Sequence, residues 1–201
     1  MSLSVLFLTF AAIFVVELPD KTFIAALVLS TRYRGLLVWI GVGLAFLVQT
    51  LIAVTVGKAV TLLPTDLVHG VAAAIFLAGA VLLVREAPKA DAEEQETEEE
   101  FAAKARTTKT GWAAVLASFL VLFAAEWGDL SQLLTISLVG RYDDPVAVFL
   151  GAWGALLTVS GLAVVAGRYL LRHVRLSVIH YVGAVVCLIL AGITAYELLL
   201  S

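Results

Sequence analysis

The sequence predicts an all-α membrane protein with six transmembrane helices, arranged as two inverted three-helix repeats. Three observations predict this fold: the composition, the length of the apolar stretches, and a duplicated set of scarce polar residues. Hydrophobic residues make up 62% of the 201 residues and charged residues only 14%, whereas soluble domains average about 45–50% apolar and about 25% charged. A soluble fold would expose much of this apolar surface. A net charge of −3 also argues against a nucleic-acid partner.

Six stretches are long and apolar enough to cross a lipid bilayer, which takes about 20 residues in a helix. They cover Leu3–Thr31, Leu36–Leu62, Leu67–Val84, Thr110–Gly140, Val146–Leu171 and Ser177–Leu199. None of them alternates apolar and polar residues as a transmembrane β-strand does. The first stretch lacks a basic leading region and a small-residue cleavage site, so we expect a true span rather than a cleaved signal peptide.

The composition changes abruptly after the third stretch, which divides the chain into a first repeat (1–86), a linker (87–109) and a second repeat (110–201). The linker contains a block of acidic residues: Asp91, Glu93, Glu94, Glu96, Glu98, Glu99 and Glu100. Like charges in a block repel one another and extend the chain. We expect a solvated and partly helical linker; the alternative is a regulatory or cation-attracting role.

Basic residues outside the six stretches predict the orientation. The first, third and fifth loops share one side of the membrane and carry most of these residues: Arg32, Arg34, Arg85, Lys89, Lys104, Arg106, Lys109, Arg168, Arg172 and Arg175. The other side carries Lys58 and Arg141. The positive-inside rule therefore predicts a cytoplasmic linker and two extracytoplasmic termini. We expect a multi-pass protein of the plasma (inner) membrane.

The second half of the chain repeats scarce polar residues and glycines of the first half. Shifts of 109 to 111 residues align Glu17 with Glu126, Asp20 with Asp129, Thr22 with Ser131, Arg32 with Arg141, Gly41 with Gly151, His69 with His180 and Glu86 with Glu197. Each half contains three predicted spans, an odd number, so the second half enters the membrane from the opposite side. Inverted repeats are common in secondary transporters, where the substrate site lies near the midplane between the repeats. A duplication retained only for helix packing is the alternative.

Two acidic pairs lie within predicted spans: Glu17 with Asp20 in the first, and Glu126 with Asp129 in the fourth. A carboxylate in hydrocarbon costs about 3 kcal/mol even on lenient scales, so such residues usually line a pathway or pair with one another. Residues three positions apart share one face of a helix. Two such pairs on related spans are therefore expected to supply four carboxylates around one point.

The helical backbone is predicted to be interrupted beside both acidic pairs. Pro19 has no N–H, so the carbonyl of Val15 loses its helical partner, and Gly128 permits a similar distortion in the second half. Irregular backbone at membrane depth is tolerated where it is buried in protein or lines a wet cavity. Free carbonyls, carboxylates and the hydroxyls of Thr22 and Ser131 form an all-oxygen environment. Such ligands favour Ca²⁺, Mn²⁺ or Mg²⁺ over Zn²⁺.

Lys21 offers a simpler explanation for the first acidic pair, because it follows Glu17 by one helical turn and would neutralise it. That explanation fails in the second half, where Leu130 stands in the place of Lys21. Four carboxylates and one lysine sum to −3, so a bound divalent cation still leaves −1. Without a cation, crowded carboxylates are expected to take up protons. Metal ions and protons then compete for the same oxygens, which is the physical basis of exchange.

The strings E-L-P-D-K-T-F (Glu17–Phe23) and E-W-G-D-L-S-Q-L (Glu126–Leu133) resemble the paired signature E-x-G-D-K/R-S/T of the Gdt family, regarded as antiporters that exchange Ca²⁺ and Mn²⁺ for protons. The resemblance covers essentially the whole chain: two three-span units, a charged linker and the duplicated signature. Pro19 stands where the first signature has Gly, and Leu130 stands where the second has a basic residue. These departures bear on ion preference and proton stoichiometry.

The resemblance implies that metal coordination and proton exchange fall to Glu17, Asp20, Glu126 and Asp129, with support from Thr22, Ser131 and Gln132. It implies a transporter rather than an enzyme, with no prosthetic group, that exports Mn²⁺ or Ca²⁺, with Mg²⁺ a further candidate, in exchange for protons. The alternatives are an exporter of small cationic or amino-acid solutes, an intramembrane aspartyl protease using Asp20 and Asp129, and a structural membrane subunit. The sequence sets no oligomeric state.

Other polar residues of the spans carry weaker predictions. Gln49, Thr50 and Ser160 either line a cavity or, more commonly for such residues, form hydrogen bonds with neighbouring helices. His69 and His180 lie near the ends of predicted spans, where placement at the membrane interface is favoured over a proton relay.

Overall fold

The computed structural model describes residues 2–18, 21–105, 109–173 and 176–200, with side chains for all of these except 91–95, 167–173, 176 and 200. This part of the chain forms helices and no strands, as predicted. The helices are α1 (Leu3–Glu17), α2 (Lys21–Arg32), α3 (Gly35–Val60), α4 (Thr65–Lys104), α5 (Trp112–Ala125), α6 (Leu130–Tyr142), α7 (Pro145–His173) and α8 (Leu176–Leu200).

Four segments are long and apolar enough to cross a membrane by themselves: Gly35–Val60 in α3, Thr65–Ala90 in α4, Pro145–Ala166 in α7 and Ser177–Leu199 in α8. Two further pairs of helices meet at sharp bends, with 70° between α1 and α2 and 73° between α5 and α6. Each bent pair is either one broken span or a re-entrant loop. By length and composition, the described residues therefore contain four candidate membrane spans, or up to six if each bent pair is one span.

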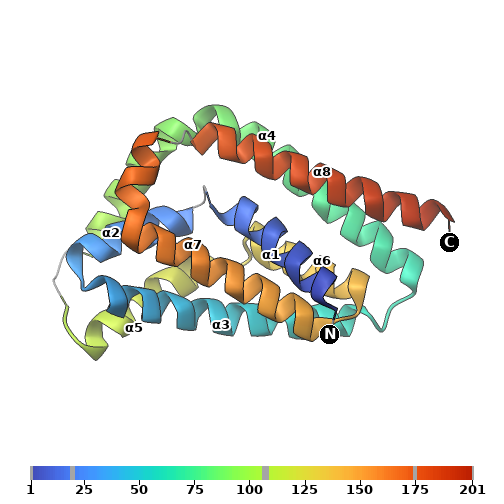
Figure 1. Cartoon of the computed structure of the whole chain (residues 1–201), viewed down its shortest axis with the longest axis horizontal. Helices are drawn as coiled ribbons and strands as arrows, with labels where there is room; N and C mark the ends of the chain where they lie inside the picture. Colours follow the sequence, from blue (N-terminus) through green and yellow to red (C-terminus); the bar gives the residue numbers. More distant parts are fainter. Residues whose placement is uncertain (1, 19–20, 106–108, 174–175, 201) are drawn as a thin grey trace.

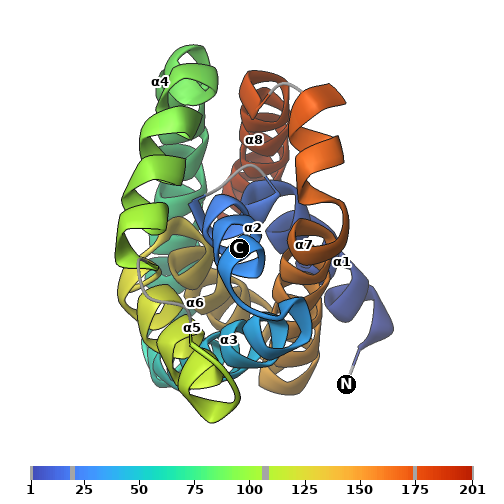
Figure 2. The same ribbon diagram turned by 90° about the vertical axis from the view of Figure 1, so that its left-hand side faces the viewer.

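The helices run mostly along the long axis of the molecule (Figure 1). α4 and α8 lie side by side as one layer, while α3 and α7 form the opposite layer, with α1 and α6 between them (Figures 1 and 2). Both termini lie at the same end of this axis. The surface is rich in exposed apolar side chains, among them Phe7, Leu51, Leu77 and Val185, as expected of helices that face lipid.

Two glycines allow unusually close contact between the two halves of the chain. A Cβ atom on Gly41 of α3 would lie 2.4 Å from the carbonyl oxygen of Val115 in α5. A Cβ atom on Gly151 of α7 would lie 2.6 Å from the carbonyl oxygen of Leu6 in α1. Small residues at such crossings let helix backbones approach one another in membranes. The first half thus packs its α3 on α5, and the second half packs its α7 on α1.

The acidic segment continues α4 as helix to Lys104, beyond Pro88. Its apolar side chains Ala90, Phe101 and Ala105 are buried against the helical core. On the exposed side, Lys104 Nζ donates a hydrogen bond to Glu100 Oε1 at 2.6 Å, and this contact lowers the pKa of the Glu100 carboxyl. The linker region is therefore packed on one side and solvated on the other.

Candidate metal centre at the two helix breaks

Both acidic motifs fall where one helix ends and the next begins. α1 ends at Glu17 and α2 begins at Lys21, while α5 ends at Ala125 and α6 begins at Leu130. The second break has a clear local cause, because Gly128 adopts a φ of +81°, a backbone conformation that L-residues rarely adopt. Pro19 and Asp20, at the first break, lie outside the described residues.

Asp129 starts α6 as its N-cap. The Ser131 backbone N–H donates a hydrogen bond to Asp129 Oδ2 at 3.3 Å, and the Ser131 hydroxyl lies 3.4 Å from the same oxygen. An aspartate at this position satisfies one of the free N–H groups of the first turn. On the other side of the break, the Gly128 N–H donates to Gln132 Oε1 at 3.0 Å. Ser131 and Gln132 therefore fix the shape of the break that carries Asp129.

Three carboxylates from the two halves of the chain converge at the breaks. One oxygen each from Glu17, Glu126 and Asp129 lies within 4.8 Å of the other two. Oxygens bound to one Ca²⁺ at about 2.3–2.6 Å are at most about 5 Å apart, so this spacing is compatible with one shared cation. Glu17 is fully buried and Glu126 is 4% exposed, whereas Asp129 is half-buried.

A hydroxyl group from the first half of the chain contacts this carboxylate cluster. Thr22, in the first turn of α2 and fully buried, donates a hydrogen bond to Glu126 Oε1. The bond orients the carboxylate and links the two motifs directly. The ends of α1 and α5 point carbonyl groups toward the breaks, whereas the starts of α2 and α6 carry free N–H groups. Carbonyl ends favour a cation, and N–H ends favour the carboxylates that hold it.

A small cavity of about 10 Å³ lies on one side of Glu126. It is lined by Phe46, Gln49, Thr50, Ala53, Glu126, Ser131, Gln132, Thr135 and Leu156, and its volume is close to that of a single water position. Gln49 of α3 also donates a hydrogen bond to the carbonyl oxygen of Phe123 at 2.8 Å. Gln49 therefore has both roles expected of a polar residue in a span: it lines a cavity and forms a hydrogen bond with a neighbouring helix. Ser160 instead donates to the Leu157 carbonyl within its own helix, at 3.1 Å.

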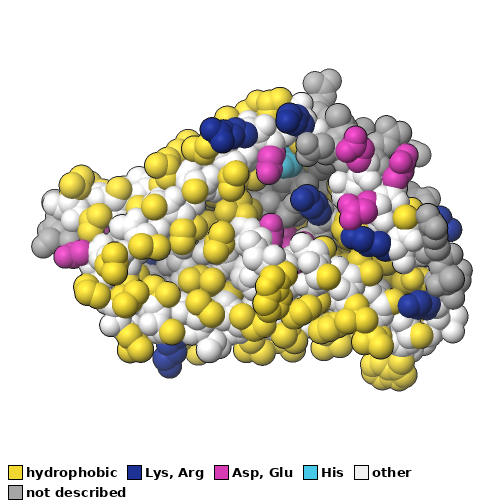
Figure 3. Space-filling model, turned by 180° about the vertical axis from the view of Figure 1, so that it is seen from behind, with side chains coloured by type: hydrophobic (Ala, Val, Ile, Leu, Met, Phe, Trp, Pro, Cys, Tyr) yellow, Lys and Arg dark blue, Asp and Glu magenta, His cyan; other side chains and the backbone are white. Residues whose placement is uncertain are grey.

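A larger cavity of about 240 Å³ reaches Asp129 from another direction. Its polar lining comes from four helices or breaks, through Lys21, Glu86, Asp129 and His180. Figure 3 shows acidic, basic and histidine side chains gathered around a hollow in a largely hydrophobic face. His180 is buried and lines this cavity. From its position near the end of a predicted span, placement at the membrane interface was expected instead. Lys21 is exposed and also lines it.

Val15 lies half-buried in the last turn of α1. The release of its carbonyl was predicted from Pro19, which is not described.

A third cavity of about 630 Å³ is lined by Gly35, Leu36, Trp39, Leu157, Thr158, Gly161, Leu162, Val164 and Val165. This lining contains no charged residue. Of these three cavities, only the two beside the helix breaks have charged residues in their lining.

Comparison with protein families finds a match to both halves of the chain. A family model described as divalent cation/proton antiporter GDT1 matches residues 5–91 and 114–200. The chain belongs to the GDT1 family. Each of the two matched segments contains one of the acidic motifs and nearly all of one bent helix pair. Members of the GDT1 family are transporters rather than enzymes, so multiple membrane spans and cation and proton substrates are expected here.

Relatives of the GDT1 family align along most of the chain. A GDT1-like protein of Synechocystis is 33% identical, with 85% of this chain and 89% of the relative covered. Protein PAM71 and the PAM71-homolog of Arabidopsis thaliana, both chloroplastic, are 30% identical over 94% and 93% of this chain. The chain spans only 56% and 58% of these two plant proteins. No solved structure matches the chain.

Proposed function

We propose that this protein exports Mn²⁺ or Ca²⁺ from the cytoplasm in exchange for protons, across the plasma (inner) membrane. The observation that carries the proposal is the convergence of Glu17, Glu126 and Asp129 from two halves of the chain, in a member of a family of divalent cation/proton antiporters. Carboxylate and hydroxyl oxygens suit hard cations. Mn²⁺ and Ca²⁺ are the candidates that the motif resemblance favours, and Mg²⁺ is the third.

In this proposal the ligands are Glu17, Asp20, Glu126 and Asp129, with Thr22 orienting Glu126 and with Ser131 and Gln132 shaping the second break. Carboxylates this close repel one another, and a counter-ion between them relieves the repulsion. A divalent cation stabilises the charged oxygens, and protons neutralise them when the cation leaves. One site thus holds either the cation or protons, and each turnover carries them in opposite directions.

Alternating access in this proposal comes from two inverted repeats, 1–86 and 110–201, joined by a cytoplasmic linker, with both termini outside the cytoplasm. Corresponding contacts between the halves support the duplication: Gly41 contacts α5 just as Gly151 contacts α1. Aromatic pairs repeat as well, with Phe10 stacked on Phe14 at 5.8 Å and Phe119 on Phe123 at 5.5 Å between ring centroids. Inverted repeats with interrupted helices at the midplane are a known design for such exchange.

The direct test is flux into liposomes that contain the purified protein and carry an imposed pH gradient. We expect Mn²⁺ or Ca²⁺ to move against the proton flow, and Glu126→Gln to lower the rate at least 100-fold. Glu99→Gln, an exposed linker residue, is the matched control and should transport normally. Flux of an organic amine without any metal requirement, or no cation flux from well-folded protein, would overturn the proposal.

A further inference from the structure

Arg141, in the last turn of α6, is a buried cation outside the metal centre. Its side chain is only 2% exposed, and it forms an ion pair with Glu197 of α8, with 2.9 Å between Nη2 and Oε1. It also donates hydrogen bonds to the Thr194 hydroxyl and, at 3.4 Å, to the Leu190 carbonyl. Ionisable residues inside a membrane protein are costly and usually serve the transport pathway.

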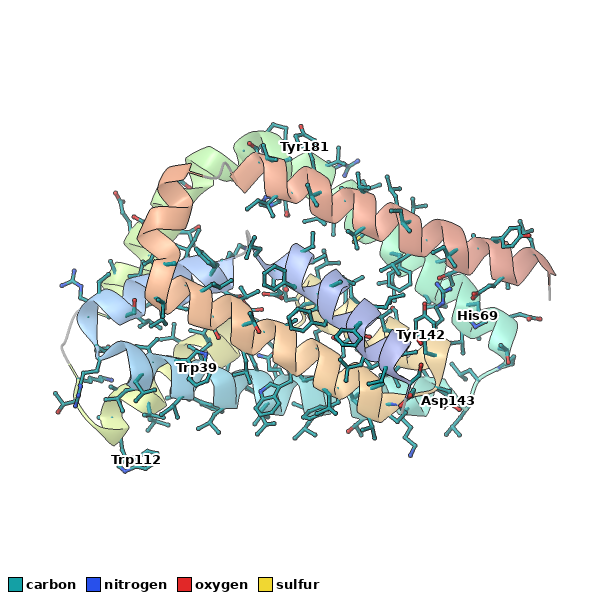
Figure 4. All side chains as sticks on the ribbon, in the orientation of Figure 1. Trp39, His69, Trp112, Tyr142, Asp143 and Tyr181 are labelled. Atoms are coloured by element: carbon teal, nitrogen blue, oxygen red, sulfur yellow. The ribbon has the colours of Figure 1, made fainter. Side chains whose placement is uncertain are left out.

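This cluster lies at the end of the molecule that carries the termini. Tyr142 and Asp143, which follow Arg141 in the chain, lie there in Figure 4, and so does His69 of α4. Tyr181, the neighbour of His180, lies toward the start of α8, away from that end (Figure 4). α4 and α8 run in opposite directions, so related residues on these two helices fall toward opposite ends.

The first half of the chain has the same residues in a different arrangement. The shifts of 109 and 111 residues relate Arg141 to Arg32, and Glu197 to Glu86. Arg32 and Glu86 are both exposed, and no ion pair joins them in the part of the chain that the structure describes. The two related pairs are therefore in opposite states, one closed and one open.

One member of the open pair, Glu86, lines the polar cavity that leads to Asp129. Leu83, Glu86 and His180 line this cavity, and the related residues at the other end are Thr194, Glu197 and His69. Arg141 covers two of these three, because it bonds Thr194 and Glu197 directly. The surface that forms an open cavity at one end is thus covered by a guanidinium at the other.

We propose that Arg141 and Glu197 form a gate that closes the ion path at the termini end, and that Arg32 and Glu86 form the corresponding gate at the other end when the protein changes state. In the present state Glu86 and His180 line the open approach to Asp129. This inference rests on the proposed function, since a transporter must close one side while the other is open. Arg141 is suited to leave its contacts with Glu197 and Thr194 when the gate opens, because its buried Nε has no hydrogen-bond partner among the described residues.

The first test measures the accessibility of the two related surfaces. The single native cysteine, buried Cys187, is replaced in a Cys187→Ser background. Leu83→Cys and Thr194→Cys then place a thiol at related positions. A charged thiol reagent applied to the purified protein should react at least tenfold faster with the Leu83→Cys thiol. Adding Arg141→Gln should raise the rate at Thr194→Cys at least tenfold, whereas Arg141→Lys should restore slow labelling.

The second test uses Arg32→Gln in the otherwise native chain. We expect the Mn²⁺ dissociation constant to stay within about twofold while Mn²⁺/H⁺ exchange slows at least tenfold, since the open end can no longer close. Arg32→Lys should exchange normally. The gate is refuted if Thr194→Cys stays unreactive in an Arg141→Gln protein that remains monodisperse, or if Arg32→Gln exchanges at the native rate. Native protein that binds no Mn²⁺ or Ca²⁺ would instead refute the proposed function, while the labelling experiment still tests the gate.

Discussion

Thr22 and Glu126 are 104 residues apart in the sequence, yet the Thr22 hydroxyl donates a hydrogen bond to the Glu126 carboxylate. The bond joins the first turn of α2 to the end of α5, and therefore joins one acidic motif to the other. Both residues are almost completely buried. If the Thr22 hydroxyl were removed, water could not readily take its place as the donor to Glu126. The two motifs are thus in direct contact.

Thr22→Val tests this link, because it keeps the shape of the side chain and removes the donor. Hydrogen bonds to charged groups contribute about 1.5–3 kcal/mol, so we expect Mn²⁺ to bind about tenfold more weakly or worse. Titration calorimetry on purified protein measures the effect. Thr55→Val is the control, since the exposed Thr55 hydroxyl donates to the Leu51 carbonyl of its own helix at 2.7 Å. Equal affinities for the two variants would contradict the prediction.

Binding of the cation should release protons. In the proposed exchange, the carboxylate oxygens of Glu17, Glu126 and Asp129, which lie within 4.8 Å of one another, bind either the cation or protons. We expect Mn²⁺ binding between pH 6 and 8 to release at least about one proton per ion, with Glu126→Gln releasing fewer. Titrations in two buffers with different ionisation enthalpies measure the number of protons. Identical apparent enthalpies in both buffers would speak against competition at one site.

The close helix contacts at Gly41 and Gly151 should not tolerate a methyl group. Each added Cβ would meet a backbone carbonyl, at 2.4 Å and 2.6 Å respectively, and backbone cannot move aside as a side chain tip can. We expect Gly41→Ala and Gly151→Ala each to destabilise the protein by about 1–3 kcal/mol, which lowers Tm by about 2–12 °C. Gly192→Ala is the control, because nothing lies within 4 Å of its Cβ position. Thermal unfolding in detergent checks the difference.

We expect the Asp144 carboxylate to stabilise the start of α1 in a pH-dependent way. Its carboxylate accepts hydrogen bonds from the Ser2 N–H at 2.6 Å and the Ala147 N–H at 3.2 Å, and these bonds lower the pKa of Asp144 below its ordinary value of 3.8. A lowered pKa in the folded state adds stability above the ordinary pKa, which disappears as the pH falls through the folded value.

We therefore expect Asp144→Asn to increase hydrogen exchange in the first turns of α1 at pH 7. The difference from the native protein should shrink as the pH falls below about 4. Exposed Asp143 is the control, and Asp143→Asn should leave α1 unchanged at both pH values. Equal protection of the α1 amides in the native and Asp144→Asn chains at pH 7 would contradict the assignment.

The helical class and the apolar spans could be predicted from the sequence, because composition and stretch length decide whether a segment suits lipid. The neighbourhood of Glu17 and Glu126 followed from the duplication, since related motifs in related spans are expected to meet. The bend at Gly128 followed from a single residue type. These features depend on local chemistry or on internal comparison, and both are visible in one chain.

The environment of the site could not be predicted in the same way. Glu86 and His180 lie far from the motifs in sequence and reach the Asp129 cavity only because α4 and α8 pack together. Helices that are apolar on all sides carry no polar face that shows which side meets its neighbour. The interhelical role of Gln49 was open for the same reason. Asp20, predicted as the fourth ligand, lies outside the described residues and stays a prediction.

The crossed glycine contacts have a consequence for how the molecule holds together. α3 of the first half packs on α5 of the second, and α7 of the second packs on α1 of the first. Neither half therefore encloses an interior of its own, and each supplies the wall that the other lacks. Cleavage of the chain in the acidic segment would leave two fragments that remain associated. Either fragment expressed alone would expose the helix surface around its glycine to lipid and would not fold stably.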